Sequence, residues 1–152
     1  DDTALVSVGY ANNEIGTVQD AAALAAVARA RGVPLHLDAV EAAGWLPLAG
    51  LGADALTIAG HKIGAPKGTG ILAVRGRLPF EPLLHGGGQE RGRRSGTPDV
   101  AGAVADLRRH KPYLFDRGGL GLPSSASLST LKCYKPFCPY PLFMPSTSSV
   151  PR

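Results

Sequence analysis

The chain has 152 residues, of which sixteen are Lys or Arg and twelve are Asp or Glu, so its formal net charge is +4. Such a basic excess can indicate a nucleic-acid or anionic-membrane partner. Residues 1–109 are nevertheless formally neutral, with eleven residues of each sign, and the excess lies in residues 110–152. We therefore expect no nucleic-acid partner, and no membrane partner either, because no stretch is long and apolar enough to cross a bilayer.

The chain begins with a strand pattern followed by a helix pattern. Small and β-branched residues at 4–9 predict a buried strand that ends at the polar turn of residues 12–14. Asp20 is a suitable N-cap for the helix that follows, and Gly32 can supply its C-terminal stop. We read the start of the chain as the middle of a larger cytoplasmic protein, since it carries no targeting peptide.

Three further strands and a second helix follow. Short apolar runs predict strands at 34–38, 53–59 and 70–75. The last helix starts at Thr97, its expected N-cap, with Pro98 in the first turn. A strand, a helix and a strand in this order imply a right-handed parallel crossover. The predicted fold class is therefore α/β with a layered sheet.

The C-terminal segment, residues 108–152, has a different composition. Residues 110–152 hold seven of the thirteen prolines and show no sustained period of 2 or 3.6. Frequent prolines forbid long helices and central strands, so we expect an irregular or disordered tail. Its two cysteines, Cys133 and Cys138, could suggest a metal site or a disulfide, but no second Cys or His pair and no secretory signal accompany them. We interpret them as incidental.

Lys62 and Asp38 are the leading candidates for chemistry, because each ends an apolar strand-like run. Ligands of open α/β sheets collect at the carboxyl ends of strands, so the two side chains are expected to face one crevice. A desolvated lysine can attack a carbonyl and form a Schiff base. Pyridoxal phosphate requires such a lysine for its aldehyde and a carboxylate for its ring nitrogen. Taken singly, however, Asp38 could be a helix N-cap and Lys62 a solvated surface charge.

Four segments extend this pattern, in one order and at close spacing. They are residues 10–19 (YANNEIGTVQ), 36–41 (HLDAVE), 60–68 (GHKIGAPKG) and 85–97 (HGGGQERGRRSGT). With these motifs the chain resembles the cysteine desulfurases, the NifS- and IscS-like group within the class V aminotransferase family. The resemblance covers roughly residues 3–107. It implies that residues 1–107 are the central part of a pyridoxal-phosphate-binding large domain of fold type I, a partial three-layer α/β/α unit.

The resemblance also implies an activity. Such enzymes remove sulfur from L-cysteine with pyridoxal phosphate, giving L-alanine and a persulfide. The persulfide serves a sulfur acceptor or an iron–sulfur scaffold protein, and the intact enzyme is a cytoplasmic homodimer. Two alternatives stay open: a selenocysteine lyase or aminotransferase of the same family, and a noncatalytic truncated fragment.

The resemblance assigns roles to individual residues. Lys62 would bind the cofactor and move the α-proton, while Asp38 would pair with the pyridinium nitrogen. Asn13 would lie beside the cofactor, although it could equally cap the turn after the first strand. His61 would touch the phosphate, or could be a satisfied loop residue. Thr97 would reach the phosphate bound by the neighbouring subunit, a role that can coexist with helix capping.

The chain departs from the family pattern in several places. Glu41 stands where many relatives carry a glutamine that donates to the phenolic oxygen, so this carboxylate must be protonated to donate, or must turn away. Ala59 replaces a serine that often holds the phosphate. Neither Cys133 nor Cys138 has the surroundings or the spacing of the family's nucleophilic cysteine. The family's upstream phosphate-binding turn and ring-stacking histidine have no counterpart in the sequence.

Overall fold

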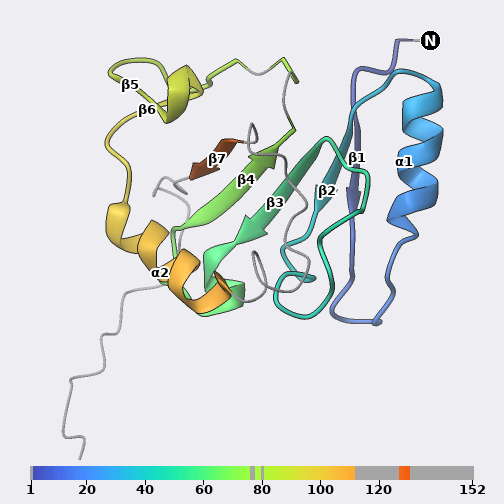
Figure 1. Ribbon diagram of the computed structural model, residues 1–152, viewed down its shortest axis with the longest axis horizontal. Coiled ribbons are helices and arrows are strands. Elements are labelled where there is room, and N and C mark those ends of the chain that lie inside the picture. Colours follow the sequence, from blue (N-terminus) through green and yellow to red (C-terminus); the bar gives the residue numbers. More distant parts are fainter. Residues whose placement is uncertain (1, 76–77, 80, 112–126, 131–152) are drawn as a thin grey trace, which may run out of the picture.

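The computed structural model describes residues 2–75, 78–79, 81–111 and 127–130, and these form a mixed α/β fold (Figure 1). The main sheet has five strands in the order β1-β2-β3-β4-β7. Its strands are β1 (Val6–Gly9), β2 (Leu35–Asp38), β3 (Ala55–Ala59), β4 (Gly70–Val74) and β7 (Ser127–Thr130). The other elements are α1 (Ala21–Ala30), α2 (Val100–Lys111), the 3-10 helices η1 (Gly60–Ile63) and η2 (Glu90–Gly92), and the short pair β5 (Gly88–Gln89) and β6 (Arg94–Ser95). The predicted α/β class is confirmed.

The β1-α1-β2 unit forms as the sequence predicts. Asp20 caps α1, with its Oδ1 accepting a hydrogen bond from the Ala23 backbone N–H at 3.0 Å. Gly32 follows the helix with a positive φ of 65°, a conformation that glycine adopts without steric cost. Strands β1 and β2 pair in parallel, as do β2 and β3. Thus the three predicted strand ends lie along one edge of the sheet.

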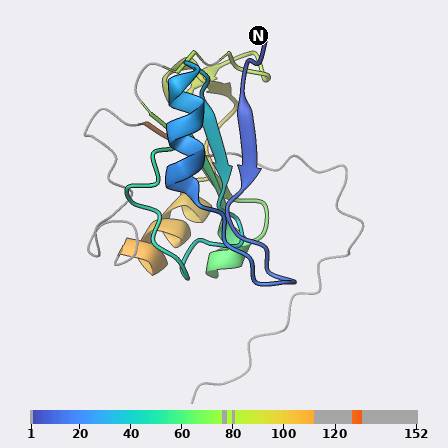
Figure 2. The same cartoon turned by 90° about the vertical axis from the view of Figure 1, so that its right-hand side faces the viewer.

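The two faces of the sheet differ in chemistry. On β2, Leu35 and Leu37 are buried and belong to the main apolar cluster, which also contains the α1 alanines Ala21, Ala25 and Ala28. Helix α1 runs beside β1 and β2 in both views (Figures 1 and 2). His36 and Asp38 point to the opposite face because side chains alternate along a strand. That polar face continues toward the edge where the candidate site lies.

Helix α2 starts later than the sequence predicts. It begins at Val100, and Asp99 caps it through an Oδ1 bond from the Gly102 N–H at 3.1 Å. The prediction that Thr97 is the N-cap, with Pro98 in the first turn, is therefore wrong. Asp99 is as suitable a cap as Thr97, and the path of the chain places its carboxylate at the start of the helix. In space α2 lies beside η1 (Figure 1).

Two parts of the predicted tail fall within the described structure: residues 108–111, which end α2, and residues 127–130. Residues 127–130 form β7, which pairs antiparallel with β4, so Leu72 is opposite Ser129 in the ladder. The expectation of irregular chain does not hold for these two short parts, which are helix and strand. Cys133 and Cys138 lie outside the described residues. No helix among the described parts of the chain is long and apolar enough to cross a membrane.

Candidate functional site

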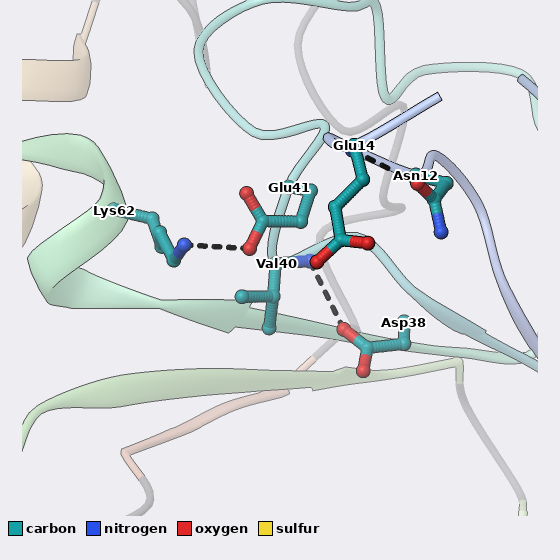
Figure 3. Close-up of polar contacts among 6 residues, drawn as sticks. All are labelled: Asn12, Glu14, Asp38, Val40, Glu41 and Lys62. Carbon is teal, nitrogen blue, oxygen red and sulfur yellow. Dashed lines mark hydrogen bonds and ion pairs between the residues drawn. The ribbon is translucent and has the colours of Figure 1, made fainter. Parts of the chain in front are cut away.

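The candidate site lies where the parallel strands β1, β2 and β3 end. Backbone hydrogen bonds hold these ends in register: the Tyr10 N–H donates to the Asp38 carbonyl at 2.8 Å, and the Ala39 N–H donates to the Thr57 carbonyl at 2.9 Å. The segments that leave this edge carry Asn13, Asp38 with Glu41, and His61 with Lys62. Asp38, Glu41 and Lys62 appear together in Figure 3. The structure therefore brings the two leading candidates to one edge, as predicted from the strand ends.

Lys62 forms an ion pair with Glu41. Its Nζ lies 2.6 Å from Glu41 Oε1, and the two side chains are 38% and 27% exposed (Figure 3). Lys62 sits on η1, and Gly64, the residue that follows this helix, has a left-handed φ of 85°. The sequence suggested a desolvated amine, but the structure shows a partly solvated ammonium with a carboxylate partner. Sequence reasoning missed this pair because it considered Glu41 only as a cofactor contact.

Asp38 is held by two hydrogen bonds, both to the same oxygen. Its Oδ1 accepts from the Val40 N–H at 3.0 Å and from the Thr57 hydroxyl at 3.3 Å. The first bond caps the turn that follows β2, so Asp38 caps a turn and not a helix as the alternative from the sequence had it, since the described residues between β2 and β3 form no helix. It does not use the whole carboxylate, since Oδ2 accepts no hydrogen bond within the described residues. One oxygen is therefore positioned and the other remains available for a ligand.

The turn after β1 separates the roles of two adjacent asparagines. Asn12 Oδ1 accepts from the Glu14 N–H at 2.9 Å and from the Ile15 N–H at 3.1 Å, which is an Asx-type turn. Asn12 therefore caps this turn, and Asn13 does not. The exposed Asn13 side chain makes no hydrogen bond in the described part of the chain, so its amide remains available at the same edge.

His61 and Thr97 lie on elements next to this edge. His61 precedes Lys62 on η1 and is exposed. Thr97 is also exposed and lies three residues before α2, which contacts η1. Ala59, at the end of β3, offers no hydroxyl where a serine is common in the resembling family. Within the described residues, Thr97 forms no hydrogen bond or ion pair with Lys62 or Asp38.

Thr57 is a site residue that sequence reasoning missed. It faces Asp38 directly across the β2–β3 ladder, and its hydroxyl reaches the carboxylate. The signal that could have found it is the polar residue in the apolar run 55–59. A threonine at the centre of such a run suggests a hydroxyl that satisfies a neighbour.

The family model described as aminotransferase class-V matches residues 1–109. The chain belongs to the aminotransferase class-V family. This family depends on pyridoxal phosphate. The resemblance inferred from the four motifs is therefore confirmed.

Similar class-V proteins include an IscS-like cysteine desulfurase of Mycobacterium tuberculosis, 55% identical over 106 residues, which cover 68% of this chain and 27% of that protein. The cysteine desulfurase IscS of Escherichia coli is 52% identical over 104 residues, covering 66% of this chain and 26% of that protein. A solved NifS-like protein superposes with a TM-score of 0.68 at 42% identity, covering 72% of this chain and 31% of that chain. The chain thus spans about a quarter of the length of the curated relatives.

The class-V cofactor fits the donor set at the strand ends. Lys62 supplies a primary amine, Asp38 supplies an oxygen that accepts no hydrogen bond from the described residues, and Asn13 supplies an amide that the turn does not use. Exposed His61 and the N–H groups of η1 lie at the same edge. This combination matches what pyridoxal phosphate requires, namely an amine, a carboxylate and phosphate donors.

Proposed function

We propose that this chain is the cofactor-binding central part of a cysteine desulfurase. The observation that carries the proposal is the common position of Lys62 and Asp38 at the carboxyl ends of adjacent parallel strands. The similarity to cysteine desulfurases of two organisms supports the reaction class. Because the chain covers only 27% and 26% of those proteins, the activity of an intact enzyme is inferred from this part.

Each residue at the site has a defined task in this proposal. Lys62 Nζ would hold the cofactor's aldehyde and, once an amino acid displaces it, would take up and return the α-proton. Asp38 Oδ2 would accept the ring N–H, and Asn13 would donate its amide beside the ring. Pyridoxal phosphate, when bound, supplies an electron sink for the α-carbon of the substrate.

The phosphate would be held from two sides. His61 and the backbone N–H groups of η1 would contact it in the same chain, since Ala59 has no hydroxyl to offer. Thr97 would contact the phosphate bound by a second copy of the chain, which makes a homodimer part of the proposal. Glu41 would have to leave Lys62 before the amine can react, and then lies next to the ring as an acid or turned away.

The proposed substrate is L-cysteine. A thiol acceptor takes the sulfur, so L-cysteine and one thiol give L-alanine and one persulfide. An iron–sulfur scaffold protein or another sulfur acceptor would then receive the persulfide in the cytoplasm. The nucleophilic thiol is not assigned to Cys133 or Cys138, which lie outside the described residues.

An absorbance titration tests this function. Added to the full chain, pyridoxal phosphate is expected to produce a saturable visible band at about one cofactor per chain, because a lysine Schiff base absorbs in the visible range. L-Cysteine should then change the band, whereas L-aspartate should not. A chain that shows no saturable band, or a band that responds to L-aspartate as strongly as to L-cysteine, contradicts the proposal.

A further inference from the structure

Three hydrogen bonds connect Asp38 with Ser7 across one face of the sheet. The Thr57 hydroxyl donates to Asp38 Oδ1 at 3.3 Å. Thr57 Oγ1 lies 3.2 Å from His36 Nε2, and His36 Nδ1 lies 2.8 Å from Ser7 Oγ. The ladder places these residues together, since Ser7 pairs with His36 and Asp38 pairs with Thr57.

The protons of these bonds run in one direction. A threonine hydroxyl has one proton, and here it goes to Asp38, so Thr57 Oγ1 must accept from His36 Nε2–H. In the ring tautomer that carries its proton on Nε2, Nδ1 has a lone pair, which accepts the Ser7 hydroxyl proton. In each of these three hydrogen bonds the donor thus points toward the Asp38 carboxylate. Hydrogen bonds aligned in this way polarise and strengthen one another.

We propose that Thr57, His36 and Ser7 are positioning residues that hold Asp38 for the cofactor's ring nitrogen. This inference rests on the proposed function, in which Asp38 Oδ2 accepts the ring N–H. The bonds to Oδ1 fix the rotation of the carboxylate and turn Oδ2 toward the ligand. With Oδ2 held toward it as a hydrogen-bond acceptor, the ring nitrogen would keep its proton as the donor.

The test uses the full chain loaded with pyridoxal phosphate labelled with ¹⁵N in the ring. Thr57→Val removes the hydroxyl with little change in shape, and Thr57→Ser keeps it. The unaltered chain and the serine variant are expected to show a protonated ring nitrogen by NMR. In the valine variant the ¹⁵N shift moves toward its unprotonated value. The dissociation constant of the cofactor rises about tenfold, since a hydrogen bond to a charged group is lost.

A double-variant cycle tests whether His36 acts through Thr57. His36→Leu should move the ¹⁵N shift in the same direction, and His36→Gln, which keeps a donor, should restore part of it. The combination of His36→Leu with Thr57→Val should match Thr57→Val alone within about twofold in affinity. A ¹⁵N shift unchanged in Thr57→Val, or effects of the two changes that multiply, would overturn the inference.

Failure of the proposed function is recognised separately. If the unaltered chain binds no pyridoxal phosphate, that function is refuted. The coupling between His36 and Thr57 is then tested on the cofactor-free protein. The unaltered chain, Thr57→Val, His36→Leu and the double variant are then compared by urea unfolding. Unfolding constants of the double variant equal to those of Thr57→Val support the coupling, whereas multiplying effects overturn it.

Discussion

Replacing Gly52 by alanine is expected to lower the free energy of unfolding by about 3 kcal/mol. Gly52 has a φ of +77°, and a Cβ built on it would lie 2.7 Å from the Ala25 Cβ of α1. Alanine would therefore add left-handed backbone strain to a steric overlap in the main core. This contact joins α1 to the loop that leads into β3, the strand that ends next to Lys62.

Gly50 offers a matched control for this substitution. Its φ is +73°, yet a Cβ there would meet nothing within 4 Å. Gly50→Ala should therefore lower the free energy of unfolding through backbone strain alone, by about 1 kcal/mol. Urea unfolding followed by circular dichroism measures both variants. Equal decreases in the free energy of unfolding for the two variants would mean that a Cβ at Gly52 does not clash with α1, contrary to the structure.

Replacing Glu41 by glutamine is expected to speed covalent capture of pyridoxal phosphate about threefold. This factor corresponds to the free energy of a partly exposed ion pair, which is less than about 1 kcal/mol. The Lys62 amine can attack the aldehyde only after it leaves its ion pair with Glu41, whose Oε1 lies 2.6 Å from Lys62 Nζ. Glutamine keeps the shape and removes the charge. Its amide can also donate to the phenolic oxygen, so affinity should rise with the rate. Stopped-flow absorbance of the visible band measures the rate.

Glu14→Gln provides the charge-matched control for this experiment. Glu14 lies on the turn after β1 and is drawn with the site in Figure 3, but it forms no ion pair with Lys62. Removing its charge should leave the capture rate within about twofold, because charges that are exposed and unpaired are screened by solvent. A Glu14→Gln rate as fast as that of Glu41→Gln would show that the negative charge around the site, not the Glu41–Lys62 ion pair, limits the rate of capture.

Local signals in the sequence were sufficient for the β1-α1-β2 unit and for the position of the site. Asp20 and Gly32 mark the ends of α1, and both act as their chemistry predicts. Lys62 and Asp38 could be placed at one edge because the carboxyl ends of parallel strands meet there. These predictions depend on short-range patterns and on one topological rule, so no knowledge of side-chain packing was needed.

Contacts between distant residues could not be predicted in the same way. The ion pair of Lys62 with Glu41 and the bond from Thr57 to Asp38 join side chains from different elements. Their formation depends on ladder register and rotamers, which no single segment encodes. The start of α2 was missed for another reason: Thr97 and Asp99 are competing caps, and only the path of the chain decides between them.

Reductive trapping tests the central claim most directly. The full chain is mixed with pyridoxal phosphate, reduced with borohydride and digested, and the peptides are mapped by mass spectrometry. The account predicts a stable adduct on Lys62, absent in Lys62→Ala and retained in Lys67→Ala, whose exposed lysine lies five residues away in the following turn. An adduct that forms on Lys67 or is spread over several lysines, or one that survives in Lys62→Ala, would contradict it.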